Sequence, residues 1–159
     1  MEKLHLYLVR HCESLGNREN IFQGQLDLDI SATGEKQLAL LALRFRNIPI
    51  DAVYSSPLKR AYKTAEAVDL YHSLPIIKLP ELMEVDVGAL SGMKLDKAFA
   101  DYPVFAEKWQ NSLQNCIFPE GETTAEVYDR AKKALARVKA DCMGKTAVIT
   151  SVSYTHLRA

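Results

Sequence analysis

The feature that most constrains the fold of this chain is an apolar run near its N-terminus that stops at an arginine–histidine pair. Residues 4–9 change from alternating to uniformly apolar, which is typical of a buried strand, and Arg10 and His11 follow directly. In open α/β sheets, ligands bind beyond the carboxyl ends of the strands. There His11 can act as a nucleophile or an acid/base group, and Arg10 offers a planar charged fork for a phosphate or carboxylate. The run therefore predicts a site for an anionic substrate at a strand end.

Strands and helices alternate along the rest of the sequence. Short apolar runs at 52–55, 75–79 and 146–150 predict three further strands. Helices are expected behind an N-cap at Ser31 to about residue 47, behind Ser56 with Pro57 at the first helical position, over 94–115 with a break near Pro103, and over about 125–141 behind Thr123 or Thr124. Strands separated by helices indicate right-handed crossovers. We therefore expect an α/β fold of three layers, with a mostly parallel sheet covered by helices on both faces.

Composition limits the kinds of partner that the chain can have. Its 159 residues suit one domain, and 20 basic residues balance 20 acidic ones. No overall charge favours nucleic acid or an anionic membrane, so anion binding must be local. We see no leader and no apolar run that could span a bilayer, and expect a cytoplasmic protein. Three cysteines without metal-type spacing indicate reduced thiols rather than a disulfide framework.

Residues beyond His11 point to the same kind of site. Asn17 lies in a loop that can fold back to the first strand end, and Gln23-Gly24 follows, where a glycine permits close approach of the backbone to a ligand. Arg60 lies in the first turn of the helix expected after strand 52–55, and a helix N-terminus with an arginine favours anions. Taken singly, His11 has an ordinary interpretation as a structural histidine and Arg60 as a solvated surface cation. Together these residues favour a phosphate site.

The sequence resembles the histidine phosphatase superfamily, also called the phosphoglycerate mutase-like or RHG family. The motifs that carry the resemblance occur in family order between residue 4 and about residue 151. They are Leu8-Val9-Arg10-His11-Cys12-Glu13-Ser14 with Asn17, Phe22-Gln23-Gly24-Gln25 with Asp27, Ile30-Ser31 with Thr33-Gly34 and Gln37, Ser55 through Arg60-Ala61, Thr64-Ala65-Glu66, Leu82-Met83-Glu84 with Gly88, and Pro119-Glu120-Gly121-Glu122-Thr123. Each motif alone is modest, but the combination is highly specific.

The resemblance implies a role for each matching residue. His11 would be the nucleophile that forms a phosphohistidine, and Arg10 and Arg60 would stabilise charge on the phosphoryl oxygens. Asn17 would contact the phosphate, with Gln23 and Gly24 also at the substrate. Glu84 would protonate the leaving alkoxide and then deprotonate water. Without the resemblance, Glu84 cannot be told from its acidic neighbours Glu81 and Asp86. No metal and no cofactor are implied.

Cys12 departs from the family pattern, which usually has glycine at this position. Cysteine is small, so the backbone tolerates it if its φ is negative, whereas a positive φ would cause strain. Because Cys12 adjoins Arg10 and His11, a low-pKa Cys12 nucleophile is an alternative to His11.

A second departure follows the last expected strand, where the family carries another catalytic histidine in a Ser-His-Gly pattern. Here Val152 follows Ser151, and His156 comes four residues late. Residues 152–159 resemble the translation of a transposase adapter used in sequencing libraries. We therefore expect an incomplete histidine phosphatase domain over 1–151, lacking its C-terminal elements, a non-native tail over 152–159, and impaired activity. A natural divergent C-terminus is the alternative.

The resemblance implies a phosphomonoester hydrolase that acts on a small phosphorylated metabolite, of the α-ribazole phosphatase type or with broad specificity. The short region between Gly88 and Pro119 favours a phosphatase over a mutase with a long insert. Phosphoglycerate mutase-type phosphotransfer is the nearest alternative. Because the second histidine is missing, a non-catalytic phosphate-binding or scaffold domain is another.

Overall fold

The computed structural model describes residues 3–112 and 116–151, and the expected tail at 152–159 lies outside this range. Its elements, in chain order, are β1 (His5–Arg10), α1 (Leu15–Arg18), α2 (Ala32–Phe45), β2 (Ala52–Ser55), α3 (Lys59–Asp69), β3 (Ile76–Lys78), the 3-10 turns η1 (Pro80–Leu82) and η2 (Gly88–Leu90), α4 (Leu95–Asp101), α5 (Pro103–Asn111), α6 (Thr124–Asp141) and β4 (Thr146–Ser151). All four predicted strands are present, and the helical region after residue 94 breaks at Pro103 as predicted.

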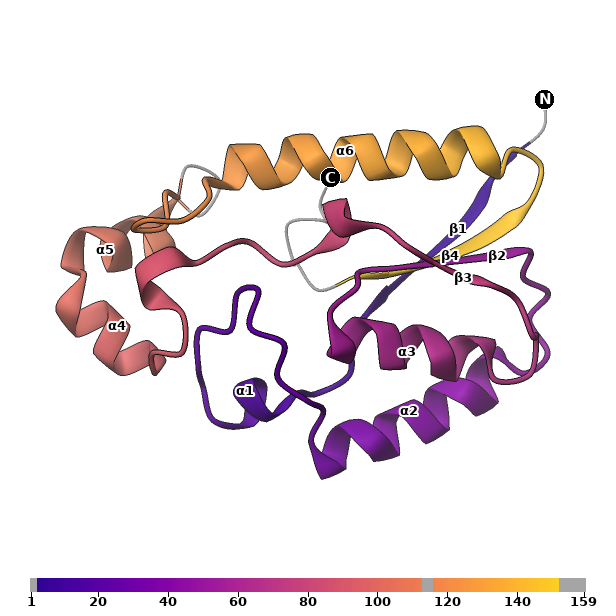
Figure 1. The fold of residues 1–159 in the computed structure, drawn as a ribbon, viewed down its shortest axis with the longest axis horizontal. Coiled ribbons are helices and arrows are strands. Elements are labelled where there is room, and N and C mark those ends of the chain that lie inside the picture. Colours follow the sequence, from indigo (N-terminus) through magenta and orange to yellow (C-terminus); the bar gives the residue numbers. More distant parts are fainter. Residues whose placement is uncertain (1–2, 113–115, 152–159) are drawn as a thin grey trace.

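The four strands form one parallel sheet in the order β1-β4-β2-β3. Helices α2 and α3 cover one face and α6 covers the other (Figure 1). Successive side chains along each strand point to alternate faces: Val53 and Val148 pack with Phe45 of α2, whereas Tyr54 and Ile149 pack on the α6 side. The prediction of a three-layer α/β fold is confirmed.

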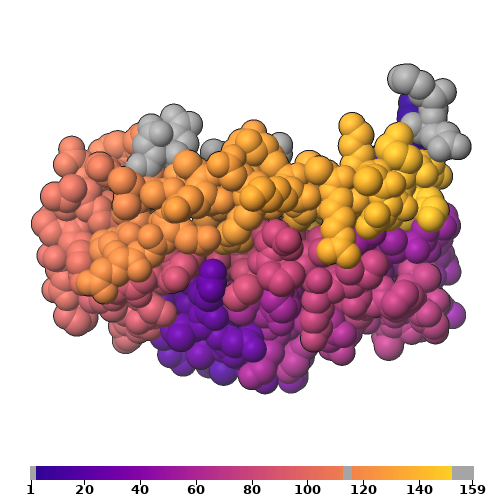
Figure 2. Space-filling view, turned by 45° about the horizontal axis from the view of Figure 1, so that its top comes forward, coloured from indigo at the N-terminus to yellow at the C-terminus, as the bar shows by residue number. Residues whose placement is uncertain are grey.

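The ends of two helices follow the predicted capping chemistry. The Ser31 side chain accepts a hydrogen bond from the Gly34 N–H (3.0 Å) at the start of α2. Thr123 caps α6 in a reciprocal capping box with Glu126. A helix thus begins directly after the turn at 119–122, which places α6 across one face of the molecule (Figure 2).

The predicted start of α3 is wrong by two residues. The helix begins at Lys59 with Leu58 at the N-cap, not at Pro57 behind Ser56. The Ser56 backbone N–H instead donates to the Thr150 carbonyl (3.0 Å), which continues the pairing of β2 with β4. The Ser56 hydroxyl accepts a longer bond from the Leu58 N–H (3.4 Å) and so caps a turn before the helix.

The prediction of a buried first strand is also wrong for the described residues. Tyr7 is 39% exposed and Leu8 is 45% exposed. Within the described sheet, β1 is an edge strand that pairs with β4 alone. Apolar side chains of this edge strand, Tyr7 and Leu8, are therefore partly exposed in the described structure.

Helices α4 and α5 lie at one end of the molecule, away from the sheet (Figures 1 and 2). They enclose a separate aromatic cluster in which Phe22 makes edge-to-face contacts with Phe99, Phe105 and Trp109. Across residues 3–112 and 116–151, no helix is long and apolar enough to cross a membrane.

Candidate active site

A cavity of about 310 Å³ lies where the carboxyl ends of the parallel strands meet the following loops. β1 ends at Arg10 and leads into His11, β2 leads into Arg60 at the start of α3, and β3 leads through η1 to Glu84. The cavity is lined by every predicted site residue, namely Arg10, His11, Asn17, Gln23, Gly24, Arg60 and Glu84. Predicted site residues up to 74 positions apart, Arg10 and Glu84, thus line one cavity because the sheet is parallel.

His11 is held as a neutral, oriented imidazole. It is 9% exposed, and its Nδ1 lies 2.5 Å from the Cys12 carbonyl oxygen. Because a carbonyl only accepts hydrogen bonds, Nδ1 must carry the proton, which leaves the Nε2 lone pair for chemistry. The pKa of His11 is lowered to about 4, mainly by burial and also by the charges of Arg60 and Arg10, against the opposing effect of the Cys12 hydrogen bond.

Asn17 is oriented by the first turn after His11. Its Oδ1 accepts hydrogen bonds from the Ser14 backbone N–H (3.1 Å) and hydroxyl (2.8 Å), in the capping box of α1. The Ser14 hydroxyl is also 2.7 Å from Gln23 Oε1. With its oxygen engaged by Ser14, the Asn17 side chain lines the cavity as a donor of amide N–H groups.

Arg60 is the largest fully buried side chain of the described residues, at 1% exposure. Its two Nη atoms donate to the carbonyls of Leu26 (2.9 Å) and Gly24 (2.8 Å) and so hold the loop at 24–26. Its Nε has no hydrogen-bond partner among the described residues. A buried guanidinium N–H without an acceptor is costly unless a ligand oxygen binds there.

Gly24 lines the cavity, and the packing around it gives a further reason for glycine at this position. Its φ is +49°, and a side chain there would approach Val87 Cγ2 to 2.7 Å. The glycine therefore permits close packing against the segment that follows Glu84, while the carbonyl of Gly24 accepts from Arg60.

Glu84 is set apart from its acidic neighbours by position. Among Glu81, Glu84 and Asp86, the cavity lining contains Glu84 alone. Its Oε1 accepts a hydrogen bond from the Val85 N–H (2.9 Å). Burial lowers the pKa of Arg60, and the charge of Glu84 opposes that shift. A carboxyl group and a buried guanidinium therefore face one cavity.

Cys12 does not have the properties of a thiolate nucleophile. Burial raises the pKa of its thiol, and its Sγ lies 3.8 Å from the Arg60 carbonyl oxygen rather than in the cavity lining. Its backbone N–H donates to Thr64 Oγ1 (3.0 Å). Among described residues other than glycine, positive φ occurs at Asn20, Ser73 and Glu120, so cysteine at 12 causes no backbone strain.

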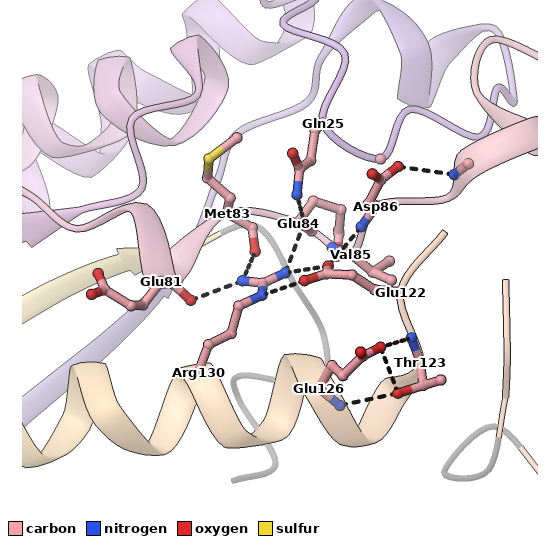
Figure 3. Close-up of polar contacts among 12 residues, drawn as sticks. Gln25, Glu81, Met83, Glu84, Val85, Asp86, Glu122, Thr123, Glu126 and Arg130 are labelled. Carbon is pink, nitrogen blue, oxygen red and sulfur yellow. Dashed lines mark hydrogen bonds and ion pairs between the residues drawn. The ribbon is translucent and has the colours of Figure 1, made fainter. Parts of the chain in front are cut away.

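Two groups of residues at the site were missed by sequence reasoning. The first is an apolar wall of the cavity, formed by Ile21, Phe22, Val85, Val87, Leu95, Trp109 and Phe118. The second is Arg130 of α6, which binds the backbone around Glu84 (Figure 3). In the sequence, Arg130 is indistinguishable from other arginines on the polar face of a helix, so no sequence pattern assigned it to the site. Over residues 3–112 and 116–151, no cluster of three or more His, Cys, Asp or Glu side chains could hold a metal ion.

The fold and the cavity define a parallel α/β protein whose strand ends carry a cavity lined by a histidine and two arginines. The sequence profile of the histidine phosphatase superfamily (branch 1) matches residues 6–156. The chain belongs to this superfamily.

Individual relatives carry the names of phosphatases and mutases. The chain is 38% identical to phosphoserine phosphatase 1 of Hydrogenobacter thermophilus, over 92% of this chain and 69% of the relative. It is 34% identical to a probable phosphoglycerate mutase GpmB of Erwinia tasmaniensis, over 83% of this chain and 61% of that protein. The solved structure of Bacillus stearothermophilus YhfR superposes with a TM-score of 0.91 at 26% identity, covering 98% of this chain and 76% of that one.

Proposed function

We propose that this chain is a phosphomonoesterase domain that works through a phosphohistidine at His11. The observation that carries the proposal is the convergence of His11, Arg10, Arg60 and Glu84 on one cavity. A neutral histidine with a free Nε2 is a nucleophile, and two arginines supply positive charge for the transferring phosphoryl group. The unpartnered Nε of Arg60 is a ready donor for a phosphoryl oxygen.

Each of the two proposed steps has a donor and an acceptor within the chain. In the first, His11 Nε2 forms a bond to phosphorus while the ester P–O bond breaks, and Glu84 gives its proton to the departing alkoxide oxygen. In the second, the Glu84 carboxylate takes a proton from water, the water oxygen bonds to phosphorus, and the P–N bond breaks to release inorganic phosphate. The same carboxyl group serves as acid and then as base.

The substrate class is proposed more broadly than any one metabolite. The relatives are named for phosphoserine and for phosphoglycerate, both small phosphorylated molecules. An α-ribazole phosphatase-like or broad specificity fits a cavity that is lined by both charged and aromatic side chains. The competing function is a mutase reaction, in which the phosphoryl group moves from one position of phosphoglycerate to another, because a relative is named as a probable phosphoglycerate mutase.

We also propose that turnover by this chain is slow. The family's second catalytic histidine is expected directly after Ser151, where the sequence has Val152. Loss of one group that stabilises transition-state charge typically lowers the rate by about 10²–10³. The first chemical step still has its nucleophile and its acid, so phosphorylation of His11 is the step to measure.

The decisive experiment uses the 159-residue chain and its His11→Ala variant. After incubation with 4-nitrophenyl phosphate, wild type releases nitrophenolate and acquires an acid-labile phosphoryl group, and His11→Ala does neither. With 3-phosphoglycerate, release of inorganic phosphate supports a phosphatase and formation of 2-phosphoglycerate supports a mutase. Phosphate binding without any His11-dependent reaction would refute the proposed phosphomonoesterase and support a non-catalytic phosphate-binding or scaffold domain.

A further inference from the structure

The backbone that carries Glu84 belongs to no helix or strand. Residues 84–87 lie between η1 and η2, so their carbonyls lack the partners that regular structure supplies. Such groups must be satisfied in another way when they are removed from water. Here the Glu84 carbonyl accepts from two side chains, Gln25 (3.2 Å) and Arg130 of α6 (2.9 Å), and Arg130 also reaches the residues just before Glu84.

The Arg130 guanidinium binds three carbonyl oxygens of residues 81–84. Its Nη1 donates to the carbonyls of Glu81 (2.8 Å) and Met83 (2.6 Å), and its Nη2 donates to that of Glu84 itself (2.9 Å), as Figure 3 shows. The planar fork of arginine matches this fan of acceptors, which a lysine ammonium could not span in the same way.

Glu122 fixes the other side of the same guanidinium. Its two carboxylate oxygens accept from Arg130 Nε (3.0 Å) and Nη2 (2.9 Å), and the Arg130 and Glu122 side chains are only 17% and 25% exposed. Glu122 also forms two hydrogen bonds with Asp86, which follows Glu84 in the chain. The Glu122 Oε2 accepts from the Asp86 N–H (2.8 Å), and the Glu122 backbone N–H donates to the Asp86 carbonyl (2.9 Å). The pair thus ties both flanks of Glu84 to α6 and to the turn at 119–122.

We propose that Arg130, together with Glu122, is the positioning residue for Glu84 and fixes the depth at which its carboxyl group enters the cavity. This inference rests on the proposed role of Glu84 as proton donor. An acid works only within hydrogen-bond reach of its target atom, and a displacement of about 1 Å can lower a rate by about 10². Arg130 itself is not among the residues that line the cavity, so it acts through Glu84.

The test compares esters whose leaving groups need protonation to different degrees. Departure of an alkoxide from an alkyl phosphate requires the acid, whereas 4-nitrophenolate leaves readily without it. For Arg130→Gln we expect kcat/KM to fall at least about 30-fold on the alkyl ester and less than about 3-fold on 4-nitrophenyl phosphate. Arg137→Gln is the matched control, since Arg137 is an exposed arginine of the same helix paired with Asp141 at 3.8 Å, and it should change neither value.

The ratio of the two rates shows whether Arg130 acts by positioning Glu84. Equal losses on both esters would mean a general loss of folded protein and would overturn the inference, as would an unchanged alkyl rate. If Arg130→Gln does not fold, Glu122→Gln and Arg130→Lys should show the same split to a smaller extent. Faster amide exchange at 84–86 in the variants reports the lost anchoring directly. Absence of His11-dependent turnover in wild type would instead refute the proposed function.

Discussion

The Nδ1–H of His11 is bonded to the carbonyl of the very next residue, Cys12, at 2.5 Å. This contact fixes the tautomer from within the same loop, without a carboxylate partner. An imidazole oriented by a neutral carbonyl gains less stabilisation of its charged form than one paired with an acid. Burial and two nearby arginines lower the pKa of His11 and outweigh this contact, which raises it, so His11 stays neutral and nucleophilic over a wide pH range.

We expect acid to destabilise the folded chain through His11. Its pKa falls from 6.5 to about 4 on folding, so between these values the unfolded state binds more protons and stability rises with pH. Protonation should lower the free energy of unfolding by about 3 kcal/mol between pH 7 and pH 4. Urea unfolding of wild type and His11→Asn across this pH range measures the contribution of His11 to the pH dependence of the free energy of unfolding. Parallel profiles for the two proteins would contradict the lowered pKa.

Much of this site could be predicted because it follows from short-range patterns. A strand that ends at Arg10-His11, and a second strand followed by a helix with Arg60, are local signals that a parallel sheet brings together. Glu84 needed the family resemblance, since only its place in the cavity distinguishes it from Glu81 and Asp86.

The features that escaped prediction depend on distant partners. Arg130 lies 46 to 49 residues from the carbonyls that it binds, and no periodicity reveals such a contact. The predicted start of α3 was wrong because the Ser56 N–H donates to the carbonyl of Thr150, 94 positions away, and so extends the pairing of β2 with β4. The exposure of Leu8 depends on which strands flank β1, which an apolar run does not disclose.

Cys12 should be dispensable for the chemistry. Its thiol is buried with a raised pKa, so it should react slowly with thiol reagents at pH 7, faster only on unfolding. We expect Cys12→Gly and Cys12→Ala to keep 4-nitrophenyl phosphate turnover within about threefold of wild type, compared with its loss in His11→Ala. A Cys12→Ala protein as inactive as His11→Ala would restore the thiol to the mechanism.

Arg60 should contribute to both stability and phosphate binding. Arg60→Lys removes the fork that holds the carbonyls of Gly24 and Leu26, and lysine cannot reproduce two parallel bonds. We expect a loss of about 2–3 kcal/mol in the free energy of unfolding and at least about 100-fold in kcat/KM. Arg44→Lys, at an exposed position of α2, is the control for the substitution itself. Undiminished affinity of Arg60→Lys for inorganic phosphate would exclude the binding role.

Gly121 should prove essential for holding the segment that follows Glu84. A Cβ on Gly121 would overlap the Asp86 carbonyl oxygen and lie 2.8 Å from the Gly88 backbone nitrogen. Because this carbonyl is the acceptor for the Glu122 N–H, the clash in Gly121→Ala must displace one of the two chain segments. We expect the free energy of unfolding to fall by about 2 kcal/mol or more, with a selective loss of activity on alkyl phosphates.

Gly92→Ala provides the comparison for that variant. Gly92 has a φ of +80°, so alanine there is strained, but its Cβ would meet only Leu26 at an ordinary 3.7 Å. It should lower the free energy of unfolding by about 1 kcal/mol and leave the ratio of alkyl to nitrophenyl ester activity unchanged. If Gly121→Ala and Gly92→Ala shift that ratio alike, backbone strain in general, and not the position of Glu84, controls proton transfer to the leaving group.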